Sequence, residues 1–72
     1  MSEQTIRFQL QPRAAAIVQR AAQALNLRVL KQTHVCDPRG QEILVVVLRD
    51  ALDAYRLAER TAGDPGWARE FL

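Results

Sequence analysis

The strongest fold signal in the sequence is the stretch Ile43-Leu44-Val45-Val46-Val47-Leu48, in which all six residues are apolar and four of them are β-branched. Such a run is typical of a strand that is buried on both faces at the centre of a sheet. Successive side chains of a strand point to opposite faces. One face therefore carries Leu44, Val46 and Leu48, and the other carries Ile43, Val45 and Val47. The rest of the chain can be placed by asking what covers these two faces.

Length and composition favour a small domain that gains stability by association. A core formed by 72 residues is usually stable by only about 3 to 5 kcal/mol, and small chains often add disulfides, a metal or a second subunit. Cys36 is the one cysteine, which excludes an internal disulfide and fits a reducing compartment. We expect a single domain over residues 1–72, with a folded core at 5–62 and a C-terminal tail at 63–72.

The charge pattern and the hydropathy argue against several classes of partner. Nine arginines and one lysine are spread along the chain against eight acids, which gives a net charge of +2. This dispersed charge is compatible with nucleic acid but does not favour it. The N-terminal residues lack the apolar core of a signal peptide, and no apolar run approaches the roughly 20 residues of a membrane span. We therefore expect a cytoplasmic protein with no membrane partner.

The N-terminal third predicts a strand followed by a helix. Residues 5–10 alternate polar and apolar side chains, which is typical of a strand with one buried face. The inward residues are Ile6, Phe8 and Leu10, and the outward residues are Thr5, Arg7 and Gln9. An alanine-rich amphipathic helix is expected from Pro12 to about Asn26, where a left-handed asparagine can end it.

The middle of the chain predicts a β-hairpin. Residues 28–36 mix β-branched and polar side chains at a period near two, which suits a second, more exposed strand. Asp37-Pro38-Arg39-Gly40 matches the residue preferences of a type I turn. The turn should join that strand to the apolar run at 43–48 in an antiparallel pair.

A second helix should follow the hairpin, because Asp50 can accept from its first free backbone N–H groups. Its apolar side is expected to consist of Ala51, Leu52, Tyr55 and Ala58. The sequence Gly63-Asp64-Pro65-Gly66 should end this helix and leave a short tail.

This order of elements predicts an α+β fold, β-α-β-β-α, with a three-stranded antiparallel sheet in the order 1-3-2. If the first crossover is right-handed, the strand at 43–48 lies between the other two and both helices cover one face. The pattern resembles the ferredoxin-like group, including ACT-type domains, over about residues 5–62, but lacks a fourth strand after the second helix. The resemblance is one of element order and carries over no ligand or active site.

Helices on one side of this sheet would leave Ile43, Val45 and Val47 exposed on the other. Burying one such side chain is worth roughly 1.5 to 3 kcal/mol, and an exposed apolar face promotes aggregation. We expect these residues to form the self-association face of a homodimer, either sheet against sheet or through the edge left free by the missing fourth strand. Alternatively, the tail folds back over them, with Trp67 and Phe71 one helical turn apart.

The tail offers a second surface for a partner. Aromatic side chains after a Pro-Gly break are often anchors in a partner's groove. We therefore expect Trp67, Phe71 and Leu72 either to bind a protein partner or to pack on their own domain.

Few residues have the chemistry of an active site or a metal site. His34 and Cys36 share a strand face and could both reach one metal ion, but two ligands are too few for a tight site in one chain. Ser2 is the only serine and has no readable triad partners. We therefore expect no catalytic residues, no cofactor and no metal, and a protein that is not an enzyme.

A second resemblance gives an alternative function. Residues 5–10 followed by Pro12-Arg13 and an alanine-rich helix look like the opening of ribbon-helix-helix repressors and antitoxins, in which paired strands of two chains enter the major groove of DNA. This resemblance implies that Thr5, Arg7 and Gln9 read base edges. The favoured reading is a small non-catalytic regulatory module that associates with itself and binds a protein or small-molecule partner.

Overall fold

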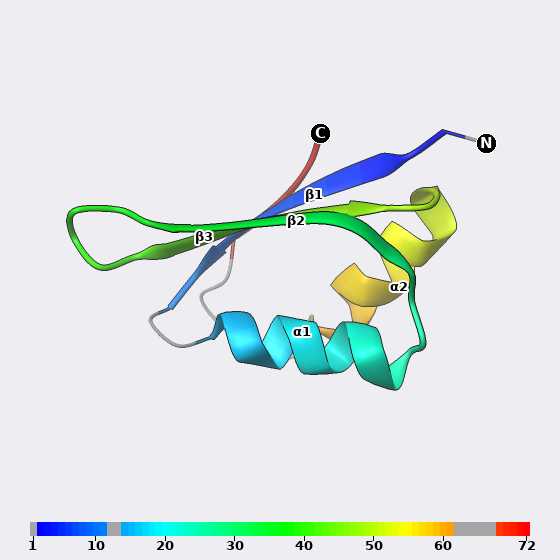
Figure 1. The fold of residues 1–72 in the computed structure, drawn as a ribbon, viewed down its shortest axis with the longest axis horizontal. Helices are drawn as coiled ribbons and strands as arrows, with labels where there is room; N and C mark the ends of the chain where they lie inside the picture. The colour runs from blue at the N-terminus through cyan, green and yellow to red at the C-terminus, as the bar shows by residue number, and fades with distance from the viewer. Residues whose placement is uncertain (1, 12–13, 62–67) are drawn as a thin grey trace.

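The computed structural model describes residues 2–11, 14–61 and 68–72, and these form four strands and two helices. In chain order the elements are β1 (Gln4–Leu10), α1 (Ala15–Ala24), β2 (Val29–Cys36), β3 (Glu42–Leu48), α2 (Ala51–Arg60) and β4 (Ala68–Phe71). The strands form one antiparallel sheet in the order β2-β3-β1-β4, and both helices lie on the same side of it (Figure 1). The predicted α+β class, with two helices on one face, is confirmed.

The apolar strand β3 lies inside the sheet, between β2 and β1, as the sequence predicts. Its residues Leu44 and Leu48 are fully buried, and Val46 is buried beside them. Ile6 is paired with Val46 and Phe8 with Leu44, so the buried sides of β1 and β3 form one continuous apolar surface. The core lies between this surface and the helices.

Helix α1 packs on the sheet through Ala15, Val18, Ala21 and Ala22. Asn26 has a φ angle of 54°, and the Leu27 N–H donates to the Ala22 carbonyl oxygen at 3.0 Å. This left-handed asparagine ends the helix in the way the sequence predicts. Residues 12–13, at the predicted helix start, lie outside the described residues.

Helix α2 begins as predicted but buries a different side. The Asp53 N–H donates to the Asp50 carboxylate at 2.9 Å, which confirms Asp50 as the cap. The buried side consists of Asp53, Ala54 and Leu57, whereas Leu52 and Tyr55 are about 60% exposed. The predicted apolar side was wrong, because the helix turns Ala54 and Leu57 toward the sheet, and Leu52 and Tyr55 therefore lie away from it.

The expectation of a missing fourth strand was wrong, because residues of the tail form β4 beside β1. Ile6 is paired with Phe71 and Phe8 with Arg69. The Arg69 guanidinium donates to the hydroxyl and carbonyl oxygens of Thr61, just after α2. A cation that satisfies acceptors at the C-terminal end of a helix is stabilising. Here the Arg69 contact also holds β4 against the end of α2. The described elements therefore have the βαββαβ order of the ferredoxin-like fold.

The ribbon-helix-helix resemblance does not hold for the fold. Strand β1 is paired on both sides, with β3 and with β4, so it has no free edge to form a ribbon with a second chain. Residues that would have to begin a second helix in that family lie in β3. Thr5, Arg7 and Gln9 are therefore interior-strand residues of a four-stranded sheet and not the outer face of a two-chain ribbon.

The β2–β3 hairpin closes through the turn that the sequence predicts. The Gly40 N–H donates to the Asp37 carbonyl oxygen at 2.9 Å, and the Asp37 carboxylate accepts from the N–H groups of Arg39 and Gln41. Gly40 has a φ angle of 83°, a backbone conformation that side chains with a Cβ disfavour.

We expect Gly40→Ala to lower the free energy of unfolding by about 1 to 2 kcal/mol, because alanine would have to adopt the same left-handed conformation. Urea unfolding followed by circular dichroism measures the loss. Arg39→Ala in the same turn is the control, since Arg39 has no positive φ and should change stability little. Equal effects of the two substitutions would contradict this account of the turn.

Candidate functional site

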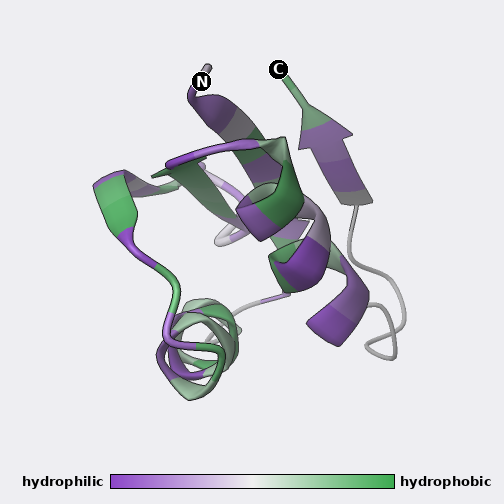
Figure 2. Ribbon diagram, turned by 90° about the vertical axis from the view of Figure 1, so that its right-hand side faces the viewer, coloured by the Kyte–Doolittle hydropathy of each residue, from purple (hydrophilic) through white to green (hydrophobic). Residues whose placement is uncertain are grey.

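The side of the sheet away from the helices, here called the open face, carries the first group of candidate residues. Because cross-strand partners share a face, the register places Thr33, Val45, Arg7 and Glu70 in one row across the four strands. The neighbouring rows contain Lys31, Val47 and Thr5 on one side, and Val35, Ile43 and Gln9 on the other. Figure 2 shows the two layers from the side, with α1 seen along its axis below the strands.

The centre of the open face is an apolar stripe formed by Val35, Ile43, Val45 and Val47. The three β3 residues are partly buried by their neighbours, and Val35 on β2 is 50% exposed. The predicted self-association residues therefore lie on one face in one strand, and the structure adds Val35 beside Ile43. No helix in the described part of the chain covers this stripe (Figure 1).

The charge beside the stripe is neutralised within the chain. The Arg7 guanidinium lies 2.8 Å from the Glu70 carboxylate, across the β1–β4 pair. Both side chains are about half exposed, so the pair adds little stability in water. Its effect is to leave the open face nearly neutral at this position.

The predicted partner-binding tail is only partly described. Phe71 is paired with Ile6, which places it on the helix-facing side of the sheet, where it is 51% exposed. Leu72 is 62% exposed, and its N–H donates to the Thr5 carbonyl oxygen. Trp67 lies outside the described residues. The described part of the tail extends the sheet and does not fold back over the apolar stripe.

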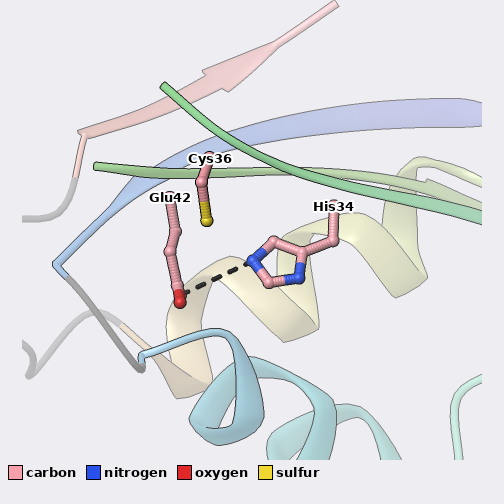
Figure 3. A group of neighbouring side chains, drawn as sticks. All are labelled: His34, Cys36 and Glu42. Carbon is pink, nitrogen blue, oxygen red and sulfur yellow. Dashed lines mark ion pairs between the residues drawn. The ribbon is translucent and has the colours of Figure 1, made fainter. Parts of the chain in front are cut away.

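The helix-facing side of the hairpin carries a second group of candidate residues, His34, Cys36 and Glu42, here called the hairpin cluster (Figure 3). Cys36 is paired with Glu42, and His34 lies two residues before Cys36 on β2. The imidazole Nε2 of His34 lies 3.7 Å from the Glu42 carboxylate. His34 and Cys36 therefore point to the same side, as the sequence predicts, and β3 adds an acidic neighbour.

Glu42 also links the hairpin to α1. Its carboxylate accepts from the Ala15 N–H at 3.2 Å, at the first residue of the helix. Ala14, the N-cap residue, offers no side-chain acceptor, and the first turn contains no acid. A carboxylate at this position satisfies a free N–H group and interacts favourably with the helix dipole. Glu42 therefore caps α1 from a neighbouring strand.

Sequence reasoning missed Glu42, although the turn contained the signal. The Asp37 N–H donates to the Gln41 carbonyl oxygen, so Asp37 and Gln41 close the hairpin and the next pair outward is Cys36 with Glu42. Reading the register from the predicted turn would have placed a third potential ligand beside His34 and Cys36.

Comparison with known proteins shows the fold alone. No protein-family model and no curated protein matches the chain. A formyltetrahydrofolate deformylase from Pseudomonas putida KT2440 has a TM-score of 0.67 and 19% identity, over 97% of this chain and 28% of that chain. A DUF2179 protein of uncharacterized function from Eubacterium ventriosum has a TM-score of 0.65 and 16% identity, over 100% of both chains.

These two similarities agree with a small ferredoxin-like α+β domain. The chain spans only 28% of the deformylase, so that enzyme's activity is not transferred to it. Neither helix of the described residues is both long enough and apolar enough to cross a membrane.

We expect Glu42→Ala to lower the free energy of unfolding by about 1 kcal/mol, because it removes the acceptor at the start of α1. The measurement is urea unfolding in the presence of a metal chelator. Glu42→Gln, which keeps an oxygen acceptor, should lose less. Glu59→Ala removes an exposed acid of α2 and is the matched control. If the Glu42 and Glu59 variants were equally stable, the capping role would be wrong.

Proposed function

We propose that this protein is a non-catalytic interaction module that works as a homodimer, with two copies packed through the open faces of their sheets. The observation that carries the proposal is the apolar stripe of Val35, Ile43, Val45 and Val47. Its residues belong to adjacent strands and form one contiguous surface. A face of this kind is stabilised when apolar surface is removed from water.

The limited core of the single chain supports a second copy as the occupant. Among the described residues, 13 apolar side chains are buried, and five of them are alanines. Alanine contributes little apolar area, so a domain of this size gains stability by burying more surface between subunits. A two-fold interface uses the same patch on both subunits, and a compact stripe along β3 and the neighbouring end of β2 suits that symmetry.

The electrostatics of the open face also favour a second copy over nucleic acid. Arg7 is paired with Glu70, so two open faces can approach without strong repulsion at this position. A surface for phosphate groups would instead present several unneutralised basic side chains.

The position of β4 bears on how two copies could associate. Strand β4 occupies the outer edge of β1, so pairing through that edge is not available. We therefore propose that the two copies pack sheet against sheet, with their apolar stripes in contact.

The two structural neighbours fit a modular role. The same fold occurs as part of a longer chain in the deformylase and as a whole chain in the DUF2179 protein. In this protein the dimer would present the exposed ends of its tails, with Phe71 and Leu72, to a protein or small-molecule partner.

We expect Val45→Asp to convert the dimer to a monomer of 8.1 kDa, measured by size-exclusion chromatography with light scattering. The new carboxylate would lie opposite Arg7, so the monomer should remain folded by circular dichroism. Val35→Asp, at the exposed end of the stripe, should weaken the dimer with even less risk to the fold.

The matched control is Leu52→Asp, because Leu52 is an exposed apolar residue of α2 and lies in the helix layer. It should leave the dimer intact. The proposal would be overturned if the wild-type protein stayed monomeric up to about 1 mM, a concentration well above the dissociation constants of common dimers. A dimer that survives both stripe substitutions would also overturn it.

A further inference from the structure

The hairpin cluster has the composition of a metal site. His34, Cys36 and Glu42 each offer one ligand atom, and these three atoms all lie within 4.8 Å of one another. They come from two adjacent strands and converge beside the start of α1 (Figure 3). The sequence-based objection that two ligands are too few does not apply, because the hairpin register supplies a third.

We propose that the hairpin cluster binds one zinc-type divalent transition-metal ion per chain. The imidazole of His34, the thiolate of Cys36 and the carboxylate of Glu42 would be the three protein ligands, and water would occupy the fourth position. This nitrogen, sulfur and oxygen set suits a borderline ion such as Zn²⁺. Mg²⁺ and Ca²⁺ prefer oxygen ligands alone, so a thiolate disfavours them.

The spacing of the ligand atoms fits a tetrahedral ion. With metal–ligand distances of about 2.0 to 2.3 Å, neighbouring ligand atoms in a tetrahedral site lie roughly 3.3 to 3.6 Å apart. The Nε2 atom of His34 and the Glu42 carboxylate are already 3.7 Å apart. The ligand atoms of the whole cluster lie within 4.8 Å of one another, so each pair would have to approach by at most about 1.5 Å to reach these separations.

The surroundings orient the acidic ligand. The Ala15 N–H holds the Glu42 carboxylate at 3.2 Å, and the Glu42 side chain is only 13% exposed. A backbone donor to a ligating carboxylate is the kind of outer contact that fixes metal ligands in position. His34 and Cys36 are more exposed, which leaves a path for the ion and room for the water ligand.

The charges also balance. A thiolate and a carboxylate carry two negative charges between them, and a divalent ion neutralises both. The site lies on the helix-facing side of the hairpin, so this proposal does not depend on the proposed dimer.

Titration with Co²⁺ tests the site directly, because cobalt absorbs visible light, unlike d¹⁰ Zn²⁺, and reports thiolate ligation by a charge-transfer band. The sample is the full chain without a polyhistidine tag, in a phosphine reductant that keeps Cys36 reduced. We expect a thiolate-to-cobalt band that saturates at one ion per chain and disappears when Zn²⁺ displaces the cobalt. Cys36→Ser should abolish the band.

His34→Gln and Glu42→Gln should each weaken binding at least about tenfold, because each removes one of three ligands. Glu59→Gln is the control and should bind as the wild type does, as should Val45→Asp on the open face. Absence of the band, or equal affinity in the Glu42 and Glu59 variants, would overturn the site. A ratio of one ion to two chains would also contradict it, since the ion would then be shared.

Discussion

The structure depends on the burial of β3, whose consecutive apolar residues Ile43 to Leu48 place apolar side chains on both faces of the sheet. Its helix-facing side is buried by the matching side of β1 and by the helices, and Leu44 and Leu48 are fully enclosed. The two helices lie on the same side of the sheet, so they cover only one face. The burial that stabilises the fold therefore leaves the other face of the same strand partly exposed, and that face is the basis of the proposed association.

The register of the β2–β3 hairpin determines both candidate surfaces. The turn at Asp37 and Gly40 pairs Val35 with Ile43 and Cys36 with Glu42. The first pair extends the apolar stripe on the open face, and the second completes the hairpin cluster on the helix-facing side. A slip of one residue would exchange the faces of every β2 side chain. The proposed association surface and the proposed metal site therefore lie on opposite sides of one hairpin.

Much of the fold could be predicted from the sequence because strong local signals agree with the tertiary structure. Each of these signals is contained in a few neighbouring residues. They are the apolar run at β3, the Asp37–Gly40 turn, the Asn26 helix end and the Asp50 cap. The strand β4 was missed because its four residues carry no clear alternation, and it forms through pairing with β1 and the contact of Arg69 with Thr61. Glu42 was missed for a related reason, since its role depends on which residue lies opposite it.

The proposed packing of two open faces is tested most directly by an isotope-filtered nuclear Overhauser experiment on a mixed dimer in which one copy is ¹³C-labelled and the other is not. We expect contacts between the two copies at the methyl groups of Ile43, Val45 and Val47. Intermolecular contacts confined to α2 or to the free edge of β2 would contradict it. Monomeric tumbling with contacts only within one chain would contradict it as well.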